Sequence, residues 1–331
     1  MMKKLVIKRR DLFRAACAGL IAAGCQPYAV GQSFPVKPIV LIAPYPAGGG
    51  VDTVARLLAE RLSVKLNQPV TVDNRPGAGS TIGGAGLARS APDGYTLMLG
   101  SMVDYAIAPH AYKSLSFDPQ KDFVAISEVG YGTVALIVNA DLPVKSIKEL
   151  VALAKAKPGT LSYASSGMGG LQHLNAEMFK QMTGIDMVHV PYKGTAQFMP
   201  DLIAGRIPLS IDSLPAHIQN IKAGKTRALA VANATRSSTL PDVPTFIEAG
   251  VAGYESSTNY TLYAPAKTPQ DIVAMLNKEI NAIIQEPALV EKFATLGIST
   301  RGGSVDSAKV RAGNEVTKWA NVIRNGNIVL N

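Results

Sequence analysis

The stretch Pro44-Tyr45-Pro46-Ala47-Gly48-Gly49-Gly50-Val51-Asp52 decides the fold of this 331-residue chain. An apolar run, 39–43, precedes it, and a helical pattern, 53–66, follows it. A strand, a glycine-rich turn and a helix in this order aim the free N–H groups and the positive dipole end of the helix at one point. Glycine lets a ligand approach the backbone closely. The stretch therefore predicts a site for a small anion at a helix N-terminus.

The rest of the chain alternates between short apolar runs and amphipathic segments. The expected strands are 70–73, 95–100, 134–139, 161–164, 187–190, 209–212 and 229–231. The expected helices are 81–88, 146–157, 172–182, 269–285, 288–296 and 304–324. Ser146, followed three residues later by Glu149, is typical of a capping box at the start of a helix. Strands separated by helices favour an α/β fold in which the sheets are mostly parallel.

A second glycine-rich loop, Ser165–Gly170, also joins an expected strand to an expected helix. Ligands of open α/β sheets bind beyond the carboxyl ends of the strands. The two loops lie in different halves of the chain, so two domains that face each other would line one cleft with both loops. A chain of about 300 residues is long enough for two such domains.

The first 31 residues have the pattern of an export signal. A basic segment, 3–10, contains a twin-arginine-like motif and precedes an apolar segment, 15–24, that is too short to span a bilayer. Cleavage after Gly31 would release the protein, whereas a lipoprotein-like box would leave a lipid anchor on Cys25. Both outcomes predict a periplasmic protein. No later stretch reaches the 18 apolar residues of a transmembrane helix.

Removal of this signal changes the composition. Residues 1–31 hold six of the 33 basic residues and one of the 24 acidic ones, so 27 and 23 remain and the net charge falls from +9 to +4. Such a small excess does not indicate a nucleic-acid-binding protein. Both cysteines, Cys17 and Cys25, are removed if cleavage follows Gly31, which excludes a disulfide, a thiol nucleophile and a cysteine metal site.

Six short stretches resemble one family in their order and spacing. They are KPIVLIAPYPAGGGVD (37–52), NRPGAG (74–79), APDGYTL (91–97), YASSG (163–167), HVPYKG (189–194) and LPDVPT (240–245). The chain resembles the substrate-binding proteins of tripartite tricarboxylate transporters, also called Bug receptors, over nearly all of its mature length. The resemblance implies a two-domain periplasmic binding protein of the Venus flytrap type, with the ligand cleft between the domains.

The resemblance also implies the organisation and the function. Residues 1–31 would be the signal, 32–132 and 254–331 the first domain, and 133–253 the second. The protein would bind a small organic carboxylate outside the cytoplasm and deliver it to the membrane permease of a tripartite tricarboxylate transporter. We expect a monomer without covalent chemistry, cofactor, metal or nucleic acid.

The same resemblance implies the ligand contacts. In the first domain these are Tyr45, Ala47, Gly48, Gly49, Val51 and Asp52 of the first loop, together with Arg75. In the second domain they are Ser165, Ser166, Gly167, Gly169 and Gly170 of the second loop, together with Tyr192, Lys193 and Asp212. In this family, backbone N–H groups of the two loops and bridging waters hold a carboxylate, which agrees with the anion site derived above.

Two positions depart from the family pattern. Val51 stands where the family more often has Thr, and Gly170 stands where it often has Ser. The loss of two hydroxyls leaves room and lowers the polarity of the site. This difference predicts a bulkier, partly apolar or aromatic carboxylate rather than citrate or a small amino dicarboxylate.

Several residues have a second interpretation. A carboxylate would repel an anion, so Asp52 either caps the helix or contacts the ligand through water. Arg75 either contacts the ligand or pairs with a neighbouring carboxylate. Lys193 is either a cleft residue or a solvated turn residue, and His173 favours a local hydrogen bond over a ligand contact.

Two other functions remain open. The same receptor could present its ligand to a membrane sensor kinase instead of a permease. An exported hydrolase on a receptor-like scaffold is less well supported, because the sequence has no Gly-x-Ser-x-Gly motif. The four histidines also lack any close metal-ligand spacing.

Overall fold

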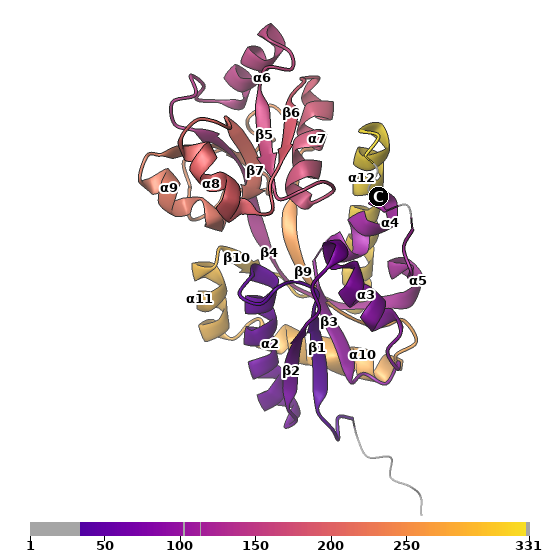
Figure 1. Ribbon diagram of the computed structural model, residues 1–331. Coiled ribbons are helices and arrows are strands. Elements are labelled where there is room, and N and C mark those ends of the chain that lie inside the picture. The colour runs from indigo at the N-terminus through magenta and orange to yellow at the C-terminus, as the bar shows by residue number, and fades with distance from the viewer. Residues whose placement is uncertain (1–33, 102, 113, 329–331) are drawn as a thin grey trace, which may run out of the picture. The chain divides into compact units, whose positions relative to one another are not determined.

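The computed structural model describes residues 34–101, 103–112 and 114–328 (Figure 1). The export signal predicted for residues 1–31, with its alternative lipid anchor at Cys25, lies outside the described residues. The chain from Lys37 onward forms one compact unit. None of the helices in the described ranges combines the length and the apolar character that crossing a bilayer requires.

Strands and helices alternate along this unit. The strands are β1 (Ile39–Ala43), β2 (Val70–Asn74), β3 (Thr96–Gly100), β4 (Phe123–Asn139), β5 (Ser162–Ser165), β6 (Val188–Pro191), β7 (Leu209–Ser213), β8 (Thr226–Val231), β9 (Ser257–Pro265) and β10 (Ile298–Thr300). The α-helices are α2 (Gly50–Leu66), α3 (Thr81–Ala88), α4 (Ala108–Ala111), α5 (Pro119–Asp122), α6 (Ile147–Ala156), α7 (Leu171–Thr183), α8 (Thr195–Ile203), α9 (Ile218–Lys222), α10 (Gln270–Ile283), α11 (Pro287–Thr295) and α12 (Val305–Asn325). Three short helical turns are η1 (Ala78–Ser80), η2 (Val103–Ile107) and η3 (Leu214–Ala216).

The strands form one sheet with two parts that share β4. In the first part, β2, β1 and β3 are parallel neighbours, and β9 lies antiparallel between β3 and β4. In the second part, β6, β5 and β7 are parallel neighbours, and β7 and β8 are antiparallel to β4. The prediction of mostly parallel sheets therefore holds only for the outer strands. The exceptions arise because β4 leads the chain out of the first part and β9 leads it back in the opposite direction.

Strand β4 changes its partners halfway along its length. Residues 123–133 pair with β9, whereas residues 134–139 pair with β7 and β8. The domain limits expected from the sequence, 132/133 and 253/254, fall close to this change and to the start of β9. They stay a prediction.

The helix starts follow local chemistry. In α6, Glu149 N–H donates to the Ser146 hydroxyl at 3.2 Å, and the Glu149 carboxylate accepts from the Lys145 N–H at 2.7 Å. This arrangement is the predicted capping box, with its return bond reaching one residue further back. The sequence missed β9, the first half of β4 and α8, and α8 contains Pro200, a residue that usually interrupts a helix.

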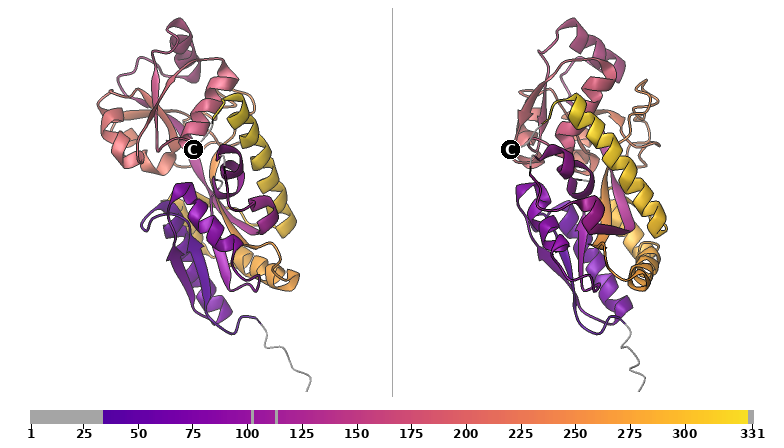
Figure 2. Two further views of the ribbon diagram at one scale, coloured as in Figure 1. Left: turned by 45° about the vertical axis from the view of Figure 1, so that its right-hand side comes forward. Right: turned by 90° about the vertical axis from the view of Figure 1, so that its right-hand side faces the viewer.

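Helix α12 connects both parts of the sheet. Trp319 is fully buried in a core that also contains Phe179 of α7. The Gln181 amide of α7 donates to the Val322 carbonyl of α12 at 3.0 Å, and Arg311 of α12 pairs with the buried Glu128 of β4 at 2.6 Å. In both views of Figure 2 this helix runs alongside α7 and the strands of the first part. The C-terminal helix α12 thus contacts both α7 and β4.

Candidate ligand site

The first glycine-rich loop joins β1 to α2. Gly49 is the N-cap of α2, and the Thr53 N–H donates to its carbonyl at 2.9 Å. Gly48 has a φ of +83°, which glycine adopts without strain. The helix therefore begins at Gly50, three residues before the predicted start. The free N–H groups of its first turn belong to residues 50–52.

Asp52 fastens this loop. Its carboxylate accepts hydrogen bonds from the Gly48 N–H at 2.8 Å, from Arg56 Nε at 3.0 Å and from Asn74 Nδ2 at 2.9 Å. The Arg56 hydrogen bond, with those from Gly48 and Asn74, outweighs burial and lowers the pKa of Asp52 to about 2. The prediction of an N-cap is wrong, because Asp52 is the third residue of the helix. Asp52 is 3% exposed and its carboxylate holds the loop, while its contact with a ligand stays a prediction.

The second glycine-rich loop joins β5 to α7, and Gly170 is the N-cap of α7. Ser165 is fully buried, and its hydroxyl bonds to both the N–H and the carbonyl of Gly167 at 3.1 Å. His189 Nε2 lies 2.6 Å from the same hydroxyl. The Gly169 N–H donates to His173 Nδ1 at 3.0 Å. The imidazoles of His173 and His189 thus hold this loop in place.

These two imidazoles are stacked with their centroids 4.1 Å apart. Tyr163 stacks on His189 and donates its hydroxyl hydrogen bond to Glu177, which pairs with Lys180. Burial lowers the pKa of both histidines, that of His189 to about 4. Because Nδ1 of His173 accepts a hydrogen bond, its ring is neutral and carries its proton on Nε2. His173 therefore makes the local hydrogen bond that the sequence favours.

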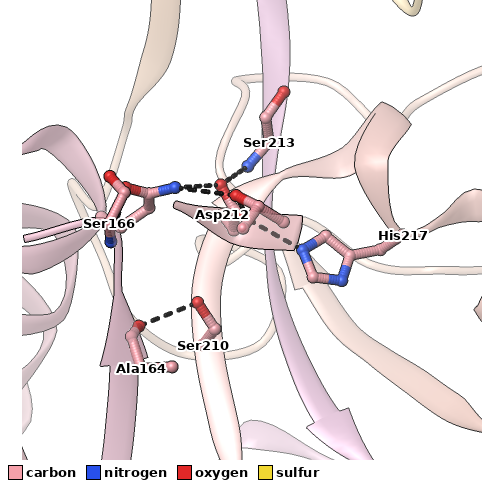
Figure 3. A network of polar contacts seen from close by, with 8 residues as sticks. Ala164, Ser166, Ser210, Asp212, Ser213 and His217 are labelled. Carbon is pink, nitrogen blue, oxygen red and sulfur yellow. Dashed lines mark hydrogen bonds and ion pairs between the residues drawn. The ribbon is translucent and has the colours of Figure 1, made fainter. Parts of the chain in front are cut away.

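Asp212 organises the wall next to the second loop. Its carboxylate accepts from Gln172 Nε2 and from Thr195 Oγ1, each at 2.7 Å, and His217 Nε2 lies 2.9 Å away. Burial disfavours the ionised form, but the hydrogen bonds from His217, Thr195 and Gln172 outweigh it and lower the pKa of Asp212. Figure 3 shows Asp212 between His217 and the Ser213 N–H.

Gln172 links Asp212 to the second glycine-rich loop. Its Oε1 accepts from the Ser166 N–H at 3.2 Å and also contacts the Ser166 hydroxyl. Both ends of the amide are therefore in use, and its orientation is fixed by Asp212 on one side and Ser166 on the other.

A cavity of about 540 Å³, here called the loop cavity, lies between these elements. Its described lining residues are Tyr45, Gly50, Val51, Gly79, Ser101, Tyr112, Val134, Ser166, Met168, Gly169, Gly170, Leu171, Gln172, Asn175, Asp212, Ser213, Thr258 and Tyr260. Both glycine-rich loops, and the residues that start α2 and α7, thus meet at one cavity.

The loop cavity contains some of the predicted contacts and not others. Those that line it are Tyr45, Val51, Ser166, Gly169, Gly170 and Asp212. Those that do not are Ala47, Gly48, Gly49, Asp52, Arg75, Ser165, Gly167, Tyr192 and Lys193. Among them, Gly48, Ser165 and Gly167 shape the loops through the hydrogen bonds described above.

Three of the predicted ligand contacts lie outside the loop cavity and have other partners or face solvent. Arg75 pairs with Asp73 at 2.8 Å. The Tyr192 hydroxyl donates to Asp201 at 2.8 Å. Lys193 is an exposed residue at the start of the turn that leads into α8. Tyr192 and Lys193 were expected in the site because they stand at a strand end, and Arg75 because it belongs to the family stretch 74–79; in the structure their side chains make local contacts or face solvent.

Several lining residues were missed. Ser101, whose hydroxyl lies 2.8 Å from that of Tyr45, and Tyr112 follow β3, whereas Thr258 and Tyr260 come from β9. Burial raises the pKa of Tyr260 to about 12, so its hydroxyl stays protonated. No local motif marks these residues, because only the pairing of β9 with β3 and β4 brings them to the cavity.

The charge of the loop cavity is unusual for an anion site. Asp212 is the only charged side chain among the described lining residues. Nor do the described ranges contain any cluster of three or more His, Cys, Asp or Glu residues that could hold a metal ion. Positive potential in this cavity must therefore come from backbone N–H groups and helix dipoles.

A second cavity, of about 520 Å³, involves neither glycine-rich loop. It is lined by Tyr131 and Thr133 of β4, by residues 214–222 and 233–239, and by residues from the end of α11 and from β10. Side chains alternate along a strand, so Tyr131 and Thr133 face the opposite side of β4 from Val134, which lines the loop cavity. The first residues of α2 and α7, Gly50 and Leu171, line the loop cavity and not the second cavity.

Known proteins resemble this chain over most of its length. Residues 54–328 match the tripartite tricarboxylate transporter family receptor, TctC. BugT of Bordetella pertussis is 36% identical over 306 residues, which cover 92% of this chain and 94% of BugT. The structure of R. palustris Rpa4515 with adipate is 36% identical, covers 90% of this chain and 100% of that chain, and has a TM-score of 0.79. The structure of MatC from Rhodopseudomonas palustris with bound malate is 27% identical, covers 88% and 100%, and has a TM-score of 0.75.

These similarities confirm the predicted fold class, that of an α/β periplasmic binding protein. The chain belongs to the tripartite tricarboxylate transporter receptor family, whose members include the Bug proteins. It is therefore a solute receptor of the periplasmic binding class and not an enzyme.

Proposed function

We propose that this receptor binds a small organic carboxylate in the loop cavity and delivers it to the membrane permease of a tripartite tricarboxylate transporter. The observation that carries the proposal is the convergence of two helix starts, at Gly50 and Leu171, on one cavity without a lysine or arginine among its described lining residues. Oriented backbone N–H groups with a helix dipole behind them hold a carboxylate without a counter-ion.

The body of the ligand is proposed to be bulky and partly apolar. Tyr45, Tyr112 and Tyr260 supply aromatic surface, and Val51 and Leu171 supply aliphatic surface. A Cβ atom at Gly170 would meet nothing closer than 3.5 Å, so its absence adds usable space. Relatives with adipate and malate show that the family accepts dicarboxylates. The smaller number of hydroxyls here favours an aromatic or long aliphatic carboxylate instead.

A calorimetric panel tests this proposal. Adipate, malate, succinate, glutamate, phenylacetate and 3-phenylpropionate would be titrated into the purified protein at pH 7.5. We expect 3-phenylpropionate or phenylacetate to bind most tightly. Tight binding of succinate or glutamate, with none of the aromatic acids, would contradict the proposed ligand class.

The partner and the location also belong to the proposal. Family membership supports a periplasmic receptor that works with a tripartite permease, and we propose that it acts as a monomer. Delivery to a sensor kinase remains the alternative, since both partners would recognise a liganded receptor. Deletion of the gene separates the two: loss of ligand uptake supports transport, whereas normal uptake with lost induction of the response supports sensing.

A further inference from the structure

One side chain of the loop cavity has no hydrogen-bond partner within the described protein. Asn175 of α7 is 1% exposed and lines the cavity. Neither its Nδ2 nor its Oδ1 has a hydrogen-bond partner among the described residues. Because both atoms are unpaired, exchanging the two ends of the amide does not change this result. No other side chain that lines the loop cavity has an unpaired buried atom of this kind.

Neighbouring polar groups of α7 behave differently. Gln172 uses both ends of its amide, and His173 Nδ1 accepts from the Gly169 N–H. A buried amide without partners destabilises the folded protein, whereas leucine of similar size would not. The unpaired amide is therefore a cost that the folded, ligand-free protein bears, and a ligand in the same cavity can offset it.

The chemistry of an amide limits which ligand group fits. An amide offers a donor and an acceptor side by side, so its complement must also accept and donate. A carboxylate only accepts, and it would leave Oδ1 facing negative charge. Asp212 lines the same cavity, with no lysine or arginine among the described lining residues to balance a second carboxylate.

We propose that Asn175 selects the ligand by binding a neutral group that both donates and accepts hydrogen bonds, a hydroxyl or a carboxamide. This inference rests on the proposed function, because the carboxylate of the same ligand occupies the helix starts. Asn175 stands four residues after Leu171, which is a rise of roughly 6 Å along the helix axis. A chain of about six carbons spans that distance.

Two matched probes test the selection. Adipate and adipamate, its monoamide, differ only in whether the far end is a carboxylate or a carboxamide. A second pair, 3-phenylpropionate and 3-(4-hydroxyphenyl)propionate, differs by one hydroxyl. By calorimetry at pH 7.5 we expect the protein to prefer the amide or hydroxyl member of at least one pair by about tenfold.

The variants separate recognition from structure. Asn175→Leu should abolish this preference, and Asn175→Asp should weaken adipate binding most strongly. Asn139→Leu is the matched control, because Asn139 is equally buried but its amide is fully used by Leu202, Ile203 and the Asp141 N–H. Without ligand, Asn175→Leu should raise the melting temperature by about 2 °C, whereas Asn139→Leu should lower it.

The outcomes are distinct. A preference that is unchanged in Asn175→Leu, or a melting temperature that falls as it does in Asn139→Leu, overturns the role of Asn175 and leaves the proposed function standing. If none of the four probes binds the wild-type protein but another carboxylate of the panel does, this inference fails and the proposed function stands; if no carboxylate binds, both fail.

Discussion

The two glycine-rich loops have the same geometry but are fastened by different chemistry. A charged carboxylate, Asp52, holds the first loop through Gly48, and its pKa of about 2 keeps it ionised at any ordinary pH. Neutral rings, His173 and His189, hold the second loop. The proposed anion site is therefore supported by two groups that respond differently to acid.

This difference shows two ways to hold a glycine-rich loop at a helix start without a lysine or arginine among the described lining residues of the loop cavity. Asp52 accepts from the Gly48 N–H and His173 accepts from the Gly169 N–H, and neither of these two side chains lines the loop cavity. The glycines remain free to approach the ligand. The predictions below test whether each support sets the ligand affinity.

Asp52→Ala should have the largest effect. It removes the acceptor for Gly48, Arg56 and Asn74 together, so we expect a loss of about 2 kcal/mol of stability and more than a tenfold loss of affinity for 3-phenylpropionate. Denaturant unfolding and calorimetry measure the two. Asp271→Ala, an exposed acidic residue in the first turn of α10, is the control and should change neither by much. Equal effects of the two variants would contradict the role of Asp52.

His173→Leu should weaken binding by about fivefold to tenfold at pH 7.5, because the Gly169 N–H loses its acceptor. In His173→Asn, the side-chain oxygen can take the place of Nδ1, so most of the affinity should return. Calorimetry and thermal unfolding of both variants measure the effect. Equal affinity in the two variants would show that the hydrogen bond does not position the loop.

Acid should weaken binding through the second loop. A histidine whose pKa is lowered by folding favours the native state fully above about pH 6.5, and this contribution is lost as pH falls toward the folded pKa, about 4 for His189. The charged groups around the ring pair are Glu177 and Lys180. Affinity and stability should therefore be constant above pH 6.5 and fall between pH 6.5 and 4.

Two controls sharpen this pH profile. The profile should be shallower in His173→Asn, which cannot titrate at that position. Asp52 adds no pH dependence between pH 6.5 and 4. The stability that it contributes is lost only below about pH 4, as the pH approaches 2. If affinity and stability stay constant down to pH 4, the two loops do not differ in their response to acid.

Gly170→Ser should shift selectivity by a few-fold. Gly170 has a φ of −71°, which serine adopts readily, and a Cβ atom there makes only ordinary contacts. The added hydroxyl takes up space and adds polarity at the start of α7, so malate should gain relative to 3-phenylpropionate. Calorimetry with both probes measures the ratio. If Gly170→Ser leaves the ratio of the two affinities unchanged, Gly170 does not determine which ligand the protein prefers.

The smallest effects are expected at two residues that the structure places outside the loop cavity. Arg75→Gln removes a half-exposed ion pair with Asp73, which contributes about 0–1 kcal/mol, and Lys193→Ala removes an exposed side chain. Each should change the affinity for 3-phenylpropionate by less than about twofold. A tenfold loss in either variant would return that residue to the binding site.

The sequence predicted those parts of the loop cavity that have local signals. The runs 44–52 and 165–170 announce a strand, a glycine turn and a helix start within a few residues, and both loops line the loop cavity. The sequence did not predict Asn175 or Tyr260. Asn175 looks like any polar residue of an amphipathic helix, and its isolation from other polar groups appears only in the packed structure.

The same reasoning explains the errors. Asp52 stands two residues after the glycines and looks like a cap, but the helix begins earlier because Gly49 is its N-cap and Gly50 its first residue. Strand β9 starts with Ser257, Thr258 and Asn259, whose polar side chains hide the strand pattern. Its place in the sheet is set by pairing with β3 and β4, which are more than 100 residues away in the chain.

One measurement tests most directly whether the two helix starts hold the ligand together. The protein, labelled with ¹⁵N at glycine, would be titrated with 3-phenylpropionate and followed by its amide signals. The signals of Gly50 and Gly170 should move together and saturate at the same ligand concentration, while that of Gly297, which lines the second cavity, stays in place. Saturable binding that moves Gly297 and leaves Gly50 and Gly170 unchanged would contradict a carboxylate site built from these two helices.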